Sequence, residues 1–161
     1  MRDADPREAA AEHFRKAYEL QMAGEYQQAI EFYTKSIEAF PTAEAYTFRG
    51  WTYSFLGDYE RAIAECRAAI QVDPEFGNPY NDIGAYLIEQ GKWEEAIPWF
   101  KQAMEAKRYE ARCYPYFNLG RVYEHKHDWV QAKQYYARAY AMDSRYVAAL
   151  AGIRRLRAAC N

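Results

Sequence analysis

The sequence predicts an all-α protein in which similar pairs of helices stack into an α-solenoid. One observation is a short motif that occurs four times, as GEYQQAI at 24–30, GDYERAI at 57–63, GKWEEAI at 91–97 and, more loosely, HDWVQAK at 127–133. The motifs begin 33, 34 and 36 residues apart, and a fixed period of about this length is typical of solenoid repeats. A second observation is that apolar residues around the motifs recur every three or four positions, which is the period of a helix.

A related segment precedes each of the last three motifs and predicts the first helix of each pair. These segments are AYTFRGWTY at 45–53, PYNDIGAYL at 79–87 and PYFNLGRVY at 115–123. In each, an aromatic residue is followed four positions later by a glycine, which is Gly50, Gly84 or Gly120. A glycine at a fixed place in a helix lets a second helix approach closely, so the two helices of a pair are expected to pack together.

Capping residues and prolines indicate where the helices begin and end. The glycine that opens a motif accepts a positive φ and ends the upstream helix. Asp58 and Asp128, which follow that position, can cap the next helix, and Asp5 with Pro6 can open the first helix of the chain. The remaining proline signals are Pro41 and Pro74 at the ends of second helices, and Pro79 and Pro115 in the first turns of upstream helices.

Read in order, the pattern is an aromatic residue, Leu-Gly, tyrosine, Gly-Asp-Tyr, alanine, an aromatic residue, alanine and proline, which resembles the tetratricopeptide repeat. The resemblance covers roughly residues 9–146 and implies one domain over 1–161, a right-handed α-solenoid of about four helix-turn-helix units with a C-terminal capping helix. The implied units are about 9–42, 43–76, 77–112 and 113–146, and the implied cap is about 147–159.

Three features depart from the family pattern. The first unit has His13, Lys16 and Ala17 in place of the aromatic residue, leucine and glycine. The fourth unit lacks both its glycine and its proline. Pro98 lies inside the second helix of the third unit, where we expect it to remove one backbone hydrogen bond.

The composition argues against several classes of protein. The net charge is −2, with 14 acidic and 8 basic side chains in 1–76 but 3 acidic and 8 basic in 113–161. Nucleic-acid binding requires a broad positive surface, so we expect none, and no apolar run is long enough for a membrane span. No segment resembles a secretory signal. The cysteines, Cys66, Cys113 and Cys160, form no metal motif and are expected to be free thiols of a cytoplasmic protein.

The resemblance also implies where a partner would bind. Solenoids of this family present a concave groove, lined by the first helix of each pair, that binds a peptide or a segment of a partner protein. Large apolar side chains in that groove would favour a helix or an extended segment that itself carries large side chains. A register error of one position would instead place some of these aromatic residues in the core. The residues expected to contact the partner are Phe14, Tyr18, Trp51, Phe55, Asn81, Phe117, Asn118 and Arg121.

One ligand class of the family is not expected. Some of its members, the chaperone-binding co-chaperones, hold the C-terminal carboxylate of a ligand with a clamp of lysines, asparagines and an arginine. The matching positions here carry no cation, and Asp82, which is one of them, would repel a carboxylate. These positions are Thr47, Trp51, Asp82, Tyr114 and Asn118 in units two to four, or Phe14, Tyr18, Phe48, Asn78 and Asp82 in units one to three.

Two other functions stay open as alternatives. The acidic N-terminal half and the basic C-terminal end could join copies of the chain into a homo-oligomer or fit it into a larger complex. The run EHKHD at 124–128 brings two histidines near two carboxylates, but it falls on an expected turn and lacks the spacing of a zinc site. No nucleophile motif, phosphate-binding loop or dinucleotide fingerprint is present. We therefore expect no enzymatic activity and no cofactor.

Overall fold

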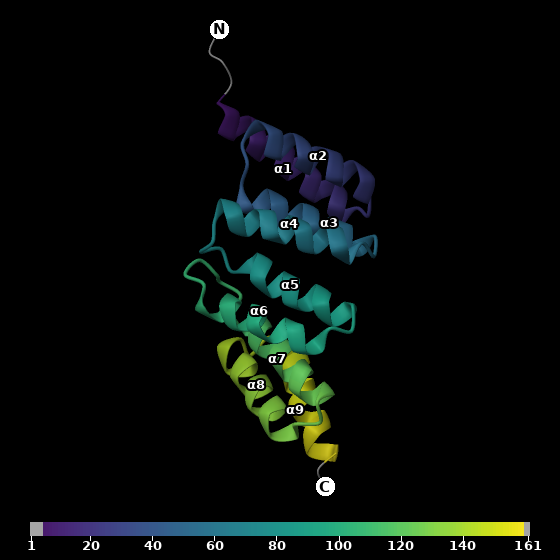
Figure 1. Cartoon of the computed structure of the whole chain (residues 1–161), viewed down its shortest axis with the longest axis vertical. Helices are drawn as coiled ribbons and strands as arrows, with labels where there is room; N and C mark the ends of the chain where they lie inside the picture. Colours follow the sequence, from purple (N-terminus) through teal and green to yellow (C-terminus); the bar gives the residue numbers. More distant parts are fainter. Residues whose placement is uncertain (1–4, 160–161) are drawn as a thin grey trace.

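The computed structural model describes residues 5–159, and these form an α-solenoid of nine helices (Figure 1). Each helix from α1 to α8 packs most extensively against its partner in the pairs α1–α2, α3–α4, α5–α6 and α7–α8. The pairs stack one on the next, so the two ends of the chain lie at opposite ends of the molecule. The helices are α1 (Pro6–Met22), α2 (Tyr26–Ala39), α3 (Ala43–Phe55), α4 (Tyr59–Val72), α5 (Asn78–Glu89), α6 (Trp93–Glu105), α7 (Cys113–His125), α8 (Trp129–Met142) and α9 (Val147–Ala159).

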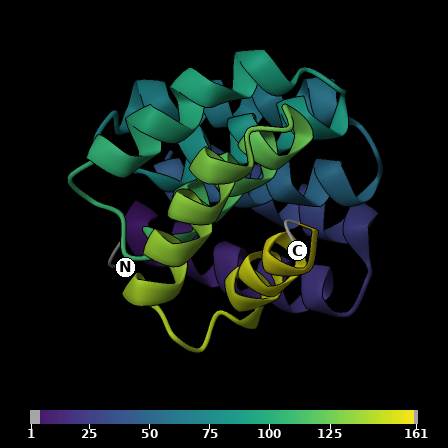
Figure 2. The same ribbon diagram turned by 90° about the horizontal axis from the view of Figure 1, so that it is seen from below.

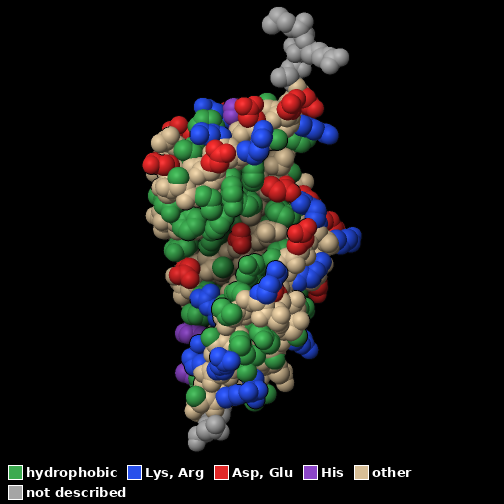
Figure 3. Space-filling view, turned by 180° about the vertical axis from the view of Figure 1, so that it is seen from behind, with side chains coloured by type: hydrophobic (Ala, Val, Ile, Leu, Met, Phe, Trp, Pro, Cys, Tyr) green, Lys and Arg blue, Asp and Glu red, His purple; other side chains and the backbone are tan. Residues whose placement is uncertain are grey.

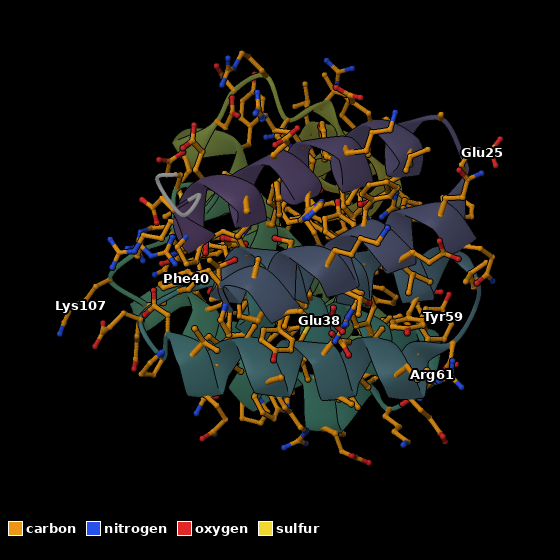
Figure 4. The ribbon with its side chains drawn as sticks, turned by 90° about the horizontal axis from the view of Figure 1, so that it is seen from above. Glu25, Glu38, Phe40, Tyr59, Arg61 and Lys107 are labelled. Carbon is orange, nitrogen blue, oxygen red and sulfur yellow. The ribbon has the colours of Figure 1, made fainter. Side chains whose placement is uncertain are left out.

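The recurring motif forms the turn within each pair. Its glycines adopt positive φ angles, for example +76° at Gly57, and His127 takes the same role in the fourth pair with a φ of 60°. Asp58 then accepts a hydrogen bond from the backbone N–H of Arg61, and Asp128 caps α8 in the same way. Figure 4 shows Tyr59 and Arg61 on the side of these turns, whereas Phe40 and Lys107 lie on the opposite side, where one pair connects to the next.

The glycines within the upstream helices mark close approaches to large side chains. A Cβ atom at Gly84 would lie 2.5 Å from the ring of Phe100 in α6, and one at Gly120 would lie 2.5 Å from the ring of Tyr136 in α8. Both rings are completely buried. At Gly50 the close neighbours are instead the backbone of Ala62 and the side chain of Glu65. In the third and fourth pairs, therefore, a large buried ring on the second helix requires a glycine opposite it on the first.

The helix α9 covers the C-terminal end of the stack, where Figure 2 shows it beside α8. Its buried side chains Ile153 and Leu156 pack against Tyr136, and Gly152 faces the other side of the same ring. Arg155 on α9 also donates two hydrogen bonds of 2.7 Å to the carboxylate of Glu124 on α7. Through these contacts α9 covers the apolar end of the solenoid, as a repeat stack requires.

Pro98 does not end a helix. The helix α6 continues from Trp93 to Glu105 with this exposed proline inside it.

The connection between α6 and α7 forms a clip to the preceding repeat. The backbone N–H of Arg108 donates to the carbonyl of Glu75, and the Arg108 carbonyl accepts from the N–H of Gly77. The guanidinium of Arg108 bonds Asp73 at 2.7 Å and Glu44 at 2.6 Å. The third motif and the fourth are 36 residues apart instead of 34, and this longer connection accommodates the clip.

Arg108→Ala is expected to lower the free energy of unfolding by about 1 kcal/mol, because it removes two charge-assisted contacts that join three segments of the chain. The loss should shrink in high salt, which screens partly exposed charges. Urea denaturation at low and high salt measures both effects. Lys107→Ala is the matched control, since Lys107 is 82% exposed and reaches only Glu75. Equal losses in the two variants would show that the guanidinium contacts of Arg108 contribute no more than the exposed Lys107 side chain does.

Candidate peptide-binding groove

A continuous aromatic patch covers the N-terminal part of the face formed by the odd-numbered helices. We define the aromatic patch as Tyr18 of α1 with Phe48, Trp51 and Phe55 of α3. The Phe48 ring lies 5.8 Å from that of Tyr18 and 5.7 Å from that of Trp51, between ring centroids, and Trp51 lies 5.3 Å from Phe55. Figure 3 shows the corresponding gathering of hydrophobic side chains in the upper part of the face opposite to Figure 1.

The aromatic patch is open to solvent even though its members pack on one another. Tyr18 is 42% exposed, Trp51 36% and Phe55 47%. Trp51 and Phe55 are four residues apart, which places both on the same face of α3. Exposed aromatic rings that are contiguous and already held by neighbours are typical of protein-binding surfaces.

Two further rings, Phe14 and Tyr26, border the aromatic patch, and Phe14 also packs on the core. Phe14 contacts Phe48 at 5.3 Å but also Tyr33, which is completely buried. Tyr26, the first residue of α2, stacks on Phe55 with ring centroids 5.1 Å apart and planes within 9°. Sequence reasoning missed Tyr26 as a possible site residue, because the motif GEYQQAI was interpreted only as a turn. The signal that could have found it is the aromatic residue two positions after each motif glycine.

Asn81, Asn118 and Arg121 form a separate polar cluster farther along the face formed by the odd-numbered helices. The side-chain amide of Asn118 donates a 3.1 Å hydrogen bond to the Asn81 carbonyl oxygen, and Arg121 donates to Asn118 at 3.3 Å. Arg121 also lies 3.9 Å from a carboxylate oxygen of Glu89. Both asparagines are only 8% exposed. What this cluster exposes is polar: a small part of each asparagine and part of the Arg121 side chain. This part of the face is therefore more polar than the aromatic patch.

Phe117 does not join either of these groups. Its ring packs against Tyr146 at 5.0 Å and Tyr136 at 5.4 Å, near the base of α9. The eight residues chosen from the sequence therefore divide into the aromatic residues of α1 and α3, the polar residues of α5 and α7, and Phe117 in a C-terminal aromatic cluster.

Asp82, which lies next to Asn81 on α5, is an acidic residue with a raised pKa. It is partly buried on α5, and burial raises the pKa of its carboxyl to about 7. The shift arises because the folded protein removes water from the charged form and supplies little in exchange.

The run at 124–128 provides no metal site in the part of the chain that the structure describes. The His125 ring stacks on Trp93 at 4.1 Å, whereas His127 lies edge-on to Trp129 in the turn. Among residues 5–159, no three His, Cys, Asp or Glu side chains are placed to hold a metal ion. Cys66 and Cys113 are buried free thiols, and Cys160 lies outside the described residues. We also find, over the same range, no helix with the length and hydropathy that a membrane span requires.

Stacked helix pairs, glycine turns and a capping helix define a helical-repeat scaffold. Models of the tetratricopeptide repeat match residues 13–42, 43–76 and 75–145, so the chain belongs to the tetratricopeptide repeat family. The structure agrees with the helix-turn-helix arrangement that the sequence motifs predict, and the resemblance is thereby confirmed.

The chain is similar to two fungal proteins, both called small glutamine-rich tetratricopeptide repeat-containing protein 2. The protein of Mycosarcoma maydis is 33% identical over 84 residues, which are 52% of this chain and 24% of that protein. The protein of Saccharomyces cerevisiae is 34% identical over 103 residues, covering 59% of this chain and 30% of the relative. The chain thus spans about a quarter to a third of the length of these relatives.

Solved structures share the fold at lower identity. The PilF protein of Pseudomonas aeruginosa matches with a TM-score of 0.86 and 23% identity, over 94% of this chain and 68% of that one. YrrB, described as a TPR protein with an unusual peptide-binding site, matches with a TM-score of 0.66 and 22% identity, over 91% of this chain and 75% of that one. These likenesses show the solenoid fold alone.

Proposed function

We propose that this protein is a non-catalytic interaction module that binds a peptide, or a segment of a partner protein, in the groove formed by its odd-numbered helices. The observation that carries the proposal is the aromatic patch, whose three exposed rings lie side by side across α1 and α3. Large aromatic side chains contribute most of the binding free energy in many protein interfaces. The peptide-binding site attributed to YrrB is consistent with this use of the fold.

We further propose that the ligand is not held by a carboxylate clamp. At the corresponding positions the groove presents aromatic rings, asparagines and Asp82 in place of lysines. Arg121, the arginine of the polar cluster, is directed toward Asn118 and Glu89. A ligand carboxylate would therefore meet the acidic Asp82, and Arg121, the cation of the polar cluster, is already occupied by Asn118 and Glu89. We propose that the protein and its partner are cytoplasmic, because free cysteines such as Cys66 and Cys113 are typical of a reducing compartment.

The Trp51→Ala, Phe55→Ala double variant is expected to lose peptide binding. A phage-displayed library of random peptides, about a dozen residues long, would be selected on immobilised wild type and on the variant. Wild type should enrich peptides with bulky apolar side chains, and the variant should enrich them at least about tenfold less. Each of the two truncations should cost about 1 kcal/mol or more, and a loss of about 1.4 kcal/mol is already tenfold.

Trp129→Ala is the matched control for this selection. Trp129 is 39% exposed, close to the 36% of Trp51, but it lies at the start of α8 outside the aromatic patch. The control should enrich the same peptides as wild type. Equal enrichment on all three proteins would refute the groove assignment, and no enrichment on wild type over the empty support would refute the proposed function.

A structural role is the second candidate, and the charge distribution favours it. Residues 1–76 carry a net charge of −6, from 14 acidic and 8 basic side chains, and residues 113–161 carry +5, from 3 and 8. Because the two ends of the chain lie at opposite ends of the stack, such charges would favour end-to-end association of copies. Light scattering at low and high salt tests this candidate, since a monomer under both conditions would remove it.

A further inference from the structure

Asp82 occupies a position on α5 that faces the preceding repeat. The equivalent residues are Phe48, 34 positions earlier, and Asn118, 36 positions later. Phe48 reaches Tyr18 of the preceding pair, and Asn118 reaches Asn81 of the preceding pair. By the same geometry we expect Asp82 to lie toward the preceding pair, α3 and α4, between the aromatic patch and the polar cluster.

The groups around Asp82 include an aromatic face and several acids but no base. Phe48, the residue equivalent to Asp82, contacts Tyr18 and Tyr33. The residues 33 positions after these are Trp51 and Cys66, so we expect Trp51 and Cys66 to lie beside Asp82. Burial raises the pKa of Cys66 and the charge of Asp82 raises it further, which agrees with this placement. The charge of Asp82 also contributes to the raised pKa values of Tyr86 and Tyr109. The groups whose pKa values the Asp82 charge raises, which are Cys66 of α4, Tyr86 of α5 and Tyr109 after α6, are thus all acids that are neutral when protonated.

Asp82 has no cationic partner among the described residues. The ion pairs found within residues 5–159 do not include it. The loss of water raises the pKa of Asp82 and outweighs the opposite effect of the neighbouring Asn81 side chain. A partly buried carboxylate without a counter-charge is unfavourable in the free protein. Such groups occur at binding sites, where a ligand supplies the missing charge.

We propose that the ligand of this groove carries a lysine or arginine beside its bulky apolar side chains, and that Asp82 binds this cation next to the Trp51 ring. The proposal rests on the proposed function, because it names the chemistry of the segment that the aromatic patch would bind. A cation at this place meets a carboxylate on one side and an aromatic face on the other, and both attract it. An acidic ligand residue at the same place would be repelled.

The peptide selection tests this directly when it is repeated on Asp82→Asn. Peptides enriched on wild type should show a lysine or arginine within a few residues of their bulky apolar positions. On Asp82→Asn the apolar preference should persist, whereas the preference for a basic residue should disappear. Asparagine keeps the size and shape of the side chain, so the change removes the negative charge and replaces one acceptor oxygen with an NH2 donor.

A double-mutant cycle then measures the pairing itself. The most enriched peptide and its Lys→Gln counterpart (or Arg→Gln) would be titrated against wild type and Asp82→Asn. Wild type should bind the basic peptide at least roughly tenfold more tightly than the glutamine peptide, and Asp82→Asn should bind the two about equally. A thermal melt of Asp82→Asn checks that it is folded.

The outcomes separate this inference from the proposed function. Enrichment of apolar peptides without a basic residue, or with an acidic one, would overturn the role of Asp82 and leave the aromatic patch as the binding surface. A basic preference that survives in Asp82→Asn would also overturn it. No enrichment on wild type would refute the proposed function itself.

Discussion

Tyr136→Ala is expected to lower the free energy of unfolding by about 3 to 5 kcal/mol, the loss usual when a buried aromatic ring is truncated. The ring is completely buried and fills the space between Gly120 on α7 and Gly152 on α9. Its hydroxyl donates a hydrogen bond to Glu124. Alanine would leave a cavity that neither glycine can fill, so α9 should separate from the stack first.

Tyr136→Phe is the control that keeps the ring and removes the hydroxyl. It should cost only about 1 kcal/mol, the usual value of one hydrogen bond. Urea denaturation followed by circular dichroism gives the free energies, and hydrogen exchange shows where the loss occurs. Amides of α9 should lose protection in Tyr136→Ala while those of α1 and α2 keep it, because each repeat contacts only its neighbours. Uniform loss along the chain, or a loss below 1 kcal/mol, would contradict this account of the C-terminal packing.

Asp82→Asn is expected to raise the free energy of unfolding by about 2 to 4 kcal/mol above neutral pH. Burial raises the pKa of Asp82 from its ordinary value of 3.8 to about 7, and each pKa unit corresponds to about 1.4 kcal/mol. The folded protein therefore holds the Asp82 proton more tightly than the unfolded chain does. Wild type should lose stability as the pH rises from about 4 to about 7, and the loss should be complete above that range.

The variant should lack this pH dependence because asparagine does not titrate. Chemical denaturation of wild type and Asp82→Asn at a series of pH values measures the difference between the two curves. The difference should be small near pH 4 and should grow through the interval up to about pH 7. A variant that is less stable than wild type above neutral pH would show that the Asp82 carboxylate has a favourable partner.

The repeat made most of the fold predictable because its residues act locally. Gly57 and Asp58 define a turn and a cap within a few residues of themselves, so the sequence alone indicates where α3 ends and α4 begins. His127 shows that the turn can be recognised even where the glycine is replaced, since the turn keeps its positive φ at this histidine. The clip at Arg108 could not be predicted, because it depends on contacts with Asp73 and Glu44 in another repeat.

The candidate site was less predictable than the fold for a related reason. Helical spacing places Trp51 and Phe55 on one face, but exposure depends on the neighbouring helix, which buries much of Phe48 and leaves Tyr18 open. Asn81 and Asn118 were proposed as contact residues for a partner, and the structure shows them bonded to each other. Such pairing between repeats is decided by the distance between helices, which no single repeat encodes.

The most direct test of the proposed groove is hydrogen exchange, measured by mass spectrometry, on wild type with and without the peptide most enriched in the selection. The account predicts that binding slows exchange in α1, α3 and α5, which carry the aromatic patch and Asp82, and leaves α2, α6 and α8 nearly unchanged beyond their first turns. Protection confined to α2, α4, α6 and α8 would contradict it, because the ligand would then occupy the other face of the solenoid.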